Sequence, residues 1–217
     1  MPDRIRVSYY TDPLCCWSWA FEEQWRKLLD EFGDSIEYRY VMCGMIPDWK
    51  SYNDPMNSVC KPIQMGPVWM HASEVTQVKM KHSIWFEDPP SSSYPSCLAV
   101  KTAGLQSDSA ADKLLSLIRK ALMEQGKNVA RTEVLFDIVK QIETENFDMD
   151  RFFSDWKKQR GIDSFREDVK KAKFHNIGRY PTLTFTNAKG KGIMITGYRP
   201  YRVLRDAFLF ANRELTS

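Results

Sequence analysis

Apolar and polar residues alternate with a period of two in four short segments, which predicts four β-strands. Two of these segments, 5–9 and 36–42, lie near the start of the chain, and two, 182–186 and 193–195, lie near its end. The tetrapeptide 187–190 between the last two has the composition of a tight turn. We therefore expect the last two strands to form an antiparallel hairpin.

Apolar residues recur every three or four positions in most of the remaining chain, which predicts helices. One helix follows the first strand and ends at Gly33, and another closes the chain from Tyr201. The stretch from about 55 to 174 has no convincing strand but five predicted helices, which start near Pro95, Asp108, Thr132, Asp148, and Asp163 or Ser164. The apolar face of the last helix carries Tyr201, Leu204, Phe208, Ala211 and Leu215.

The resulting order, βαβ, then helices, then ββα, predicts an α/β protein with one four-stranded mixed sheet. The first, second and fourth strands should run parallel and the third antiparallel to them. We interpret residues 1–54 and 175–217 as one domain and residues 55–174 as a large helical domain inserted into it. The five inserted helices should pack as one cap over the end of the sheet that carries Cys15.

Composition excludes several classes of protein. A net charge of +3 in 217 residues, with basic and acidic residues interleaved, argues against nucleic-acid binding. No apolar run approaches the ~18 residues that a membrane span needs, and the first residues lack the apolar core of a secretion signal. We therefore expect a cytoplasmic protein that contacts no membrane. Five scattered cysteines and three histidines give neither a disulfide framework nor zinc spacing.

The segment from Asp12 to Trp19, just after the first strand, carries the chemistry. Backbone N–H groups and the helix dipole at a helix N-terminus stabilise a thiolate, which is the nucleophilic form of cysteine. Cys15 is therefore the candidate nucleophile. We expect it to be the first or second residue of its helix, with a partly exposed sulfur. Cys16 points about 100° away around the helix and should face the protein.

These residues resemble the DsbA-like thioredoxin-fold family, in particular its FrnE-like dithiol-disulfide isomerase branch. That branch has the pattern Asp-Pro-x-Cys-x-Trp-Cys-Trp after its first strand, and Asp12, Pro13, Cys15, Trp17 and Trp19 match it in register. The segment from Gly178 to Phe185 is similar to the family's cis-proline strand. The resemblance implies a thioredoxin fold, a cis Tyr180–Pro181 bond beside Cys15, and a substrate-binding surface that includes Trp17, Arg179 and Tyr180.

One departure from the family pattern decides the chemistry. Ser18 stands where the second cysteine of the C-x-x-C pair belongs, and a serine cannot attack a mixed disulfide. The segment is also similar to kappa-class glutathione transferases and their isomerase relatives, which carry Ser-Pro-Tyr-Ser-Trp in the same register. That second resemblance places Cys15 at the position facing sulfur and makes Ser18 a hydrogen-bond donor near it.

Three functions are compatible with these residues. The first is a monothiol disulfide oxidoreductase or isomerase that uses Cys15 and Pro181, with Cys16 as an auxiliary thiol, and acts on a thiol- or disulfide-bearing protein. It would use glutathione as a co-substrate and no tightly bound cofactor. The second is a glutathione-dependent transferase or isomerase of kappa-class type, with an electrophile pocket lined by Lys61, Trp69 or Arg179. The third is a thioredoxin-fold adapter without catalysis. A homodimer is a further hypothesis. We interpret Cys43, Cys60 and Cys97 as packing residues, although Cys43 or Cys60 could approach Cys15 in space.

Overall fold

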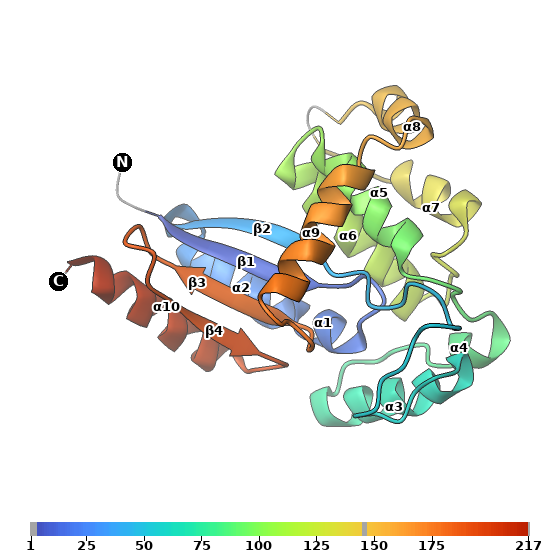
Figure 1. Ribbon diagram of the computed structural model, residues 1–217, viewed down its shortest axis with the longest axis horizontal. Coiled ribbons are helices and arrows are strands. Elements are labelled where there is room, and N and C mark those ends of the chain that lie inside the picture. Colours follow the sequence, from blue (N-terminus) through green and yellow to red (C-terminus); the bar gives the residue numbers. More distant parts are fainter. Residues whose placement is uncertain (1–3, 145–146, 217) are drawn as a thin grey trace.

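Four strands form one mixed sheet in the order β2-β1-β3-β4. The protein is described by a computed structural model covering residues 4–144 and 147–216 (Figure 1). The strands occupy the segments that alternation predicts, at β1 (Ile5–Thr11), β2 (Ile36–Met42), β3 (Thr182–Thr186) and β4 (Gly192–Thr196).

Strand directions agree with the expected topology. β1 runs parallel to β2, with Tyr9 opposite Tyr40, and antiparallel to β3, with Tyr9 opposite Leu183. β4 pairs antiparallel with β3, so β1, β2 and β4 share one direction. The pairing of β1 with β3 matters for function. It places Tyr180, two residues before β3, next to Cys15, which follows β1, although 165 residues separate the two in sequence.

Helices surround this sheet. Before β2 lie α1 (Cys16–Ala20) and α2 (Glu22–Phe32), followed by the 3₁₀ turn η1 (Gly33–Ser35). Between β2 and β3 lie η2 (Pro62–Gln64), α3 (Met65–Thr76), α4 (Ile84–Glu87), α5 (Tyr94–Gly104), α6 (Asp108–Met123), α7 (Thr132–Val139), α8 (Met149–Lys157) and α9 (Ile162–Phe174). The chain closes with α10 (Tyr201–Thr216), whose Leu215 side chain lies outside the described part.

The two faces of the sheet have different cores. Alternate residues Ile5, Val7 and Tyr9 of β1 pack with Trp25 and Leu28 of α2 and with α10, in the main apolar cluster. On the other face, a smaller cluster joins Tyr10 and Val41 to Ala172 of α9. Because side chains of a strand alternate between faces, the period of two in β1 supplies both cores.

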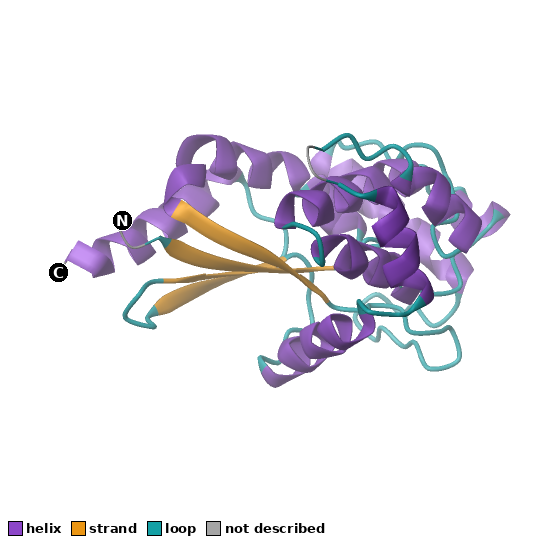
Figure 2. Ribbon diagram, turned by 90° about the horizontal axis from the view of Figure 1, so that it is seen from above, coloured by secondary structure: helices purple, strands orange, loops and turns teal. Residues whose placement is uncertain are grey.

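The inserted helices gather at one end of the sheet, where β1 ends and α1 begins, whereas β1 starts and α10 ends at the other (Figures 1 and 2). Between residues 55 and 174 the described residues form no strand beyond one bridge from Asp54 to Val59. The expected cap is present only in part, because α9 packs on a face of the sheet through Ala172. The status of the inserted helices as a separate domain stays a prediction.

The described residues of this middle stretch form seven α-helices where sequence periodicity predicts five. The prediction missed α3 and α4. Gly66 and Pro67 in the first turn of α3 hide its pattern, although proline is tolerated there because those N–H groups need no helical partner. α4 is a single turn. Asp148 caps α8 as expected, since its carboxylate accepts from the Arg151 N–H at 2.9 Å.

Two other expected caps are wrong. Thr132 is already the first residue of α7, and α9 begins at Ile162, after Gly161. Asp163 and Ser164 therefore lie in the first turn of α9 rather than before it. Helix ends are set by local hydrogen bonds that periodicity does not record, so errors of one or two residues are expected.

A polar network fastens the inserted helix α6 to the sheet half. Arg26 of α2 donates two hydrogen bonds to Asp112 of α6, at 2.8 and 2.7 Å. Tyr40 of β2 donates to the same carboxylate at 2.5 Å. Arg119 of α6 reaches back and forms an ion pair with Glu22 at 2.7 Å. A half-buried bidentate ion pair between arginine and a carboxylate fixes the relative orientation of two helices better than an exposed ion pair does.

Candidate functional site

Cys15 lies in the tight turn that joins β1 to α1. Its N–H donates to the Asp12 carbonyl at 3.1 Å, and its backbone is extended, with φ −80° and ψ 111°. Cys15 is therefore the N-cap of α1, and the expectation that it is the first or second helical residue is wrong. Its side chain is only 5% exposed, so the expectation of a partly exposed sulfur is also wrong. The reason is that the turn folds inward against the segment before β3.

Burial dominates the electrostatics of this thiol. Burial raises the pKa of Cys15 above its ordinary value, against the smaller lowering effects of the Ser18 hydroxyl, the Ser18 N–H and the Arg119 guanidinium. The Asp12 carboxylate raises that pKa further. The prediction of a thiolate favoured by the helix terminus is therefore wrong. α1 has only five residues, too few to build a strong dipole, whereas loss of water disfavours any charge.

The segment before β3 forms the other wall of the site. The Tyr180–Pro181 peptide bond is cis, as the resemblance implies. The Cys15 thiol donates to the Tyr180 carbonyl oxygen, with 3.6 Å between Sγ and O. The expected proximity of Cys15 to this segment is therefore confirmed.

The two residues that sequence places beside Cys15 are both buried. Ser18 is 0% exposed, and its hydroxyl has no hydrogen-bond partner of ordinary geometry among the described residues. Cys16 is 3% exposed and faces the protein as expected, and burial raises its pKa well above the ordinary value. A buried hydroxyl without a partner is uncommon. Ser18 thus keeps a donor free beside the reacting sulfur.

The Asp12 carboxylate holds the Cys15 turn in place through hydrogen bonds. One oxygen of this fully buried carboxylate accepts from the Leu14 N–H at 2.9 Å, and the other from the Met45 N–H at 2.6 Å and the Ser93 hydroxyl at 2.9 Å. Burial nevertheless raises the pKa of Asp12. The sequence identifies Asp12 as part of the family pattern but gives it no role, whereas in the structure it joins the Cys15 turn to two distant segments.

Residues on the rim of the site come from five parts of the chain. Half-buried Trp17 contacts His71 of α3 and Tyr198 after β4, with ring centroids 5.9 and 6.4 Å apart. Exposed Arg179 donates to the Met56 sulfur at 3.6 Å. The roles of Trp17, Arg179 and Tyr180 in binding substrate stay predictions.

The residues expected to line an electrophile pocket differ in exposure, and the pocket itself stays a prediction. Trp69 is fully buried and packs against Trp85, with ring centroids 5.3 Å apart, so its assignment as a pocket wall is wrong. Lys61 is exposed at the N-cap of η2.

Two residues near Cys15 were missed by sequence reasoning. Tyr52 follows β2 by ten residues, and the charges of Cys15 and Cys16 are among the causes that raise its pKa, after burial and Asp54. Arg119 lies on α6 and is fully buried. Neither belongs to a motif, and each is more than thirty residues from Cys15, so only the tertiary fold brings them together.

The other thiols are free. Cys43 and Cys97 are buried, as packing residues should be, and Cys97 donates to the Asp12 carboxylate at 3.5 Å. Cys60 is exposed instead, beside Gln64. Within residues 4–144 and 147–216, no three His, Cys, Asp or Glu side chains are grouped so as to hold a metal ion.

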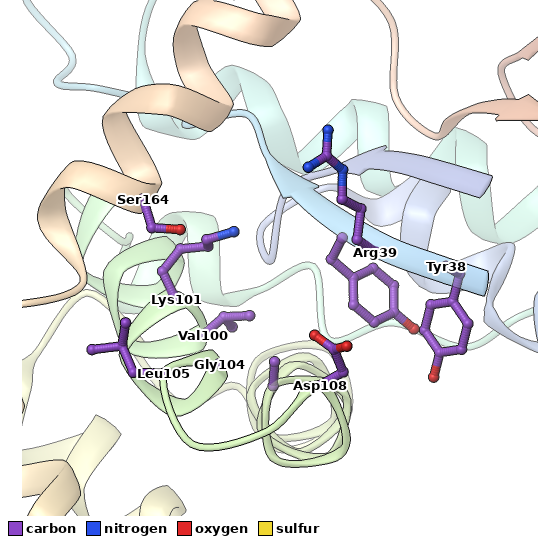
Figure 3. Close-up of a pocket in the computed structure, with 10 residues that line it drawn as sticks. Tyr38, Arg39, Val100, Lys101, Gly104, Leu105, Asp108 and Ser164 are labelled. Atoms are coloured by element: carbon purple, nitrogen blue, oxygen red, sulfur yellow. The ribbon is translucent and has the colours of Figure 1, made fainter. Parts of the chain in front are cut away.

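Cavities among the described residues lie apart from Cys15, and two of them involve the inserted helices. An apolar groove of about 570 Å³ runs between α5, α8 and α9, with Leu98, Trp156 and Phe165 in its lining and Arg166 and Lys170 at its edge. A smaller cavity of about 210 Å³ separates β2 from α5, α6 and α9, and Lys101, Asp108 and Ser164 reach it from the helices (Figure 3). Its Lys101 is already paired with Asp168 at 2.8 Å.

This arrangement defines a class. A four-stranded sheet of this topology, a cysteine at the turn after β1 and a cis-proline before β3 describe a thioredoxin-fold protein with a helical insertion. A thioredoxin family model matches residues 9–206, and the chain belongs to that family. No helix in the described segments is both long and apolar enough to span a bilayer.

Solved structures share the whole fold. A "putative protein disulfide isomerase" from Nitrosomonas europaea superposes with a TM-score of 0.81 at 17% identity, covering 97% of this chain and 98% of that one. The cytosolic disulfide reductase DsbM from Pseudomonas aeruginosa gives 0.70 at 16% identity, with the same coverage, and its structure with GSH gives 0.67. The chain therefore has the fold of DsbA-like oxidoreductases.

The curated relatives have a different name. The ClpXP adapter protein SpxH of Halalkalibacterium halodurans is 27% identical over 201 residues. The match covers 92% of this chain but 65% of the relative, and the SpxH of Bacillus subtilis gives 25% identity with 66% of its length covered. The chain thus spans about two thirds of the length of these relatives.

Proposed function

We propose that the protein is a thiol–disulfide oxidoreductase or isomerase that acts through Cys15 as a lone thiol. One observation carries the proposal: the Cys15 sulfur lies against the Tyr180 carbonyl, with the unpartnered Ser18 hydroxyl in place of a second thiol. The sulfur is a chemically reactive group in this turn that also borders the segment before β3. Exposed Arg179 and half-buried Trp17 supply a surface for the substrate at the rim.

The reaction has two exchange steps. The Cys15 thiol first loses its proton, and the thiolate attacks one sulfur of a substrate disulfide. The substrate S–S bond breaks, a Cys15–substrate disulfide forms, and the other substrate sulfur leaves as a thiolate that takes up a proton. Because Ser18 cannot resolve this adduct, an external thiol such as glutathione attacks it, frees Cys15 and carries the disulfide away. The Ser18 hydroxyl stabilises the sulfur that bears charge in each step.

The burial of Cys15 sets the pH behaviour of this chemistry. Since the pKa of Cys15 is raised, little thiolate exists at neutral pH, and the rate should rise with pH. A thiol with a higher pKa is a stronger nucleophile once ionised, which partly offsets its low thiolate fraction. The proposed location is the cytoplasm, and the similarity to DsbM, a cytosolic disulfide reductase, supports it. In that compartment glutathione would serve as the co-substrate.

The test is turnover of a peptide that carries a glutathione mixed disulfide, with glutathione as the reductant. Wild type should release the free peptide with a rate that rises from pH 6 to pH 9, and Cys15→Ser should lose that activity. Cys60→Ser is the matched control, because Cys60 is exposed and far from the Cys15 turn in sequence, and it should retain full activity. Equal activity in Cys15→Ser and wild type would overturn the proposal.

A second function, a non-catalytic adapter, is favoured by separate observations. The curated relatives are named ClpXP adapter proteins, and Cys15 is buried with a raised pKa. The apolar groove beside α9, with Arg166 and Lys170 at its edge, offers an adapter a protein-binding surface. Under this function Cys15→Ser leaves partner binding intact, whereas Leu98→Asp in the groove abolishes it, and both can be measured by calorimetry with a purified partner.

A further inference from the structure

Arg119 is a buried cation supplied to the Cys15 turn by an inserted helix. Its side chain, on α6, is 0% exposed. One guanidinium nitrogen donates to Glu22 at 2.7 Å and the other to the Thr11 hydroxyl, while the guanidinium lies 5.8 Å from the centre of the Tyr9 ring. Its Nε has no partner among the described residues. A cation held this far from water is strongly felt by neighbouring charges.

Each residue that Arg119 contacts lies close to the turn that carries Cys15, or is hydrogen-bonded to it. Thr11 is the last residue of β1, four positions before Cys15. The Tyr9 hydroxyl donates to the Ser18 carbonyl at 3.5 Å, and Glu22 begins α2 immediately after the turn and α1. Arg119 thus contacts the two ends of the segment that presents Cys15, and through Tyr9 it reaches the residue that replaces the second thiol.

Charge balance does not explain why Arg119 is present. Glu22 already has a second cation, because Arg26 lies 2.6 Å from it, and Arg26 also pairs with Asp112. Removing Arg119 would leave both carboxylates partnered. Burying an arginine costs desolvation free energy. Because Glu22 has another cation, this cost points to a role for Arg119 beyond stabilising the fold.

We propose that Arg119 is a positioning residue for Cys15, which fixes the turn that carries the thiol and supplies the buried positive charge near the thiolate. This inference rests on the proposed function of Cys15 and adds that the inserted helices take part in it. Apart from Arg119, the described groups that the hydrogen bonds and charges place around the thiol are acids, thiols, hydroxyls and a backbone carbonyl, which supply no positive charge. They are Tyr9 of β1, Asp12 of the turn, Cys16 and Ser18 of α1, Tyr52 after β2 and Tyr180 before β3.

The test is the pH dependence of alkylation of Cys15 by iodoacetamide, in a Cys60→Ser background. Arg119→Met removes the charge and keeps the length of the side chain. It should raise the midpoint of the pH profile by about one unit, which slows alkylation about tenfold at pH values below the midpoint. Arg119→Lys should restore most of the rate. Arg26→Met is the matched control, since it breaks the same network at Glu22 and Asp112 without touching Thr11 or Tyr9.

The outcomes separate the two proposals. An unchanged midpoint in Arg119→Met, or an equal shift in Arg26→Met, would overturn this inference and leave the proposed function in place. A wild-type Cys15 that does not react in the folded protein up to pH 10 would overturn both. If Arg119→Met fails to fold, Glu22→Gln gives the opposite test, because a neutral acceptor leaves more positive charge near Cys15. Its midpoint should fall, and an unchanged midpoint would overturn the inference.

Discussion

Asp12→Ala removes the acceptor that joins the Cys15 turn to two distant segments. Its carboxylate accepts from the N–H groups of Leu14 and Met45 and from the Ser93 hydroxyl, at 2.9, 2.6 and 2.9 Å. Alanine leaves the Leu14 and Met45 N–H groups without an acceptor in a site that excludes water, whereas the Ser93 hydroxyl keeps only the Ile46 carbonyl, at 3.5 Å. Asparagine at this position keeps one acceptor oxygen, so fewer of these donors lose their partner.

The size of the loss follows from the number of orphaned donors. Each buried donor without an acceptor costs about 1–3 kcal/mol, and the variant regains part of this because it no longer buries a carboxylate. We expect Asp12→Ala to lower the free energy of unfolding by about 3–5 kcal/mol, at the upper end for single substitutions. Asp12→Asn should lose about 1–3 kcal/mol.

The pH dependence has a definite sign. Burial raises the pKa of Asp12 in the folded protein above its unfolded value. Protonation of this carboxyl therefore favours the folded state, and that contribution is complete below the unfolded pKa, about 4, and is lost as the pH rises through the folded pKa. Asparagine does not titrate. The stability advantage of wild type over Asp12→Asn should therefore shrink as the pH rises.

Urea unfolding followed by tryptophan fluorescence, at several pH values between 4 and 8, measures both effects. Asp137→Asn is the control, because that carboxylate is exposed and pairs only with Lys140 in the same helix region, and it should change stability little. A loss below about 1 kcal/mol in Asp12→Ala, or a wild-type advantage over Asp12→Asn that grows with pH, would refute the role assigned to Asp12.

Three further predictions concern other parts of the molecule. Gly44→Ala should cost about 2 kcal/mol in urea unfolding, because φ is +61° and a Cβ would lie 2.7 Å from a Tyr94 ring carbon; unchanged stability would show that the turn relaxes freely. Ser107→Ala should cost about 1 kcal/mol, since Ser107 caps α6 through the Ala110 N–H at 3.0 Å, and an unshifted midpoint would contradict that cap. Titration with a thiol-reactive dye should label exposed Cys60 first and Cys15 and Cys43 more slowly, with Cys16 and Cys97 reacting only on unfolding; early labelling of Cys97 would argue against the packing described.

The sheet could be predicted from sequence because its strands and hairpin turn are specified by short, local sequence patterns. Alternation in β1 and β2 and the turn composition at 187–190 fix the strands and the terminal hairpin. Helices connect β1 to β2, and such a connection favours a parallel pairing with a right-handed crossover. α3 was missed because Gly66 and Pro67 interrupt its pattern.

The position of the site was predictable and its electrostatics were not. The Asp-Pro-x-Cys pattern and the Tyr180–Pro181 segment identify two residues that do meet. The degree of burial of Cys15 depends on how the inserted segments close over it, and no periodicity encodes that. Arg119 and Tyr52 reach the turn from more than thirty residues away, so their influence on the thiol appears only in the folded chain.

The mass of the folded protein after treatment with glutathione disulfide tests most directly whether Cys15 works as a lone thiol. In the Cys60→Ser background we predict a single adduct of one glutathione per chain, located on Cys15, that persists until an external thiol is added. Ser18→Cys in the same background should abolish that persistence by forming an internal disulfide. Contradiction would come from an internal disulfide between Cys15 and Cys16 or Cys43, or from a Cys15 that stays unmodified in the folded protein and reacts only after denaturation.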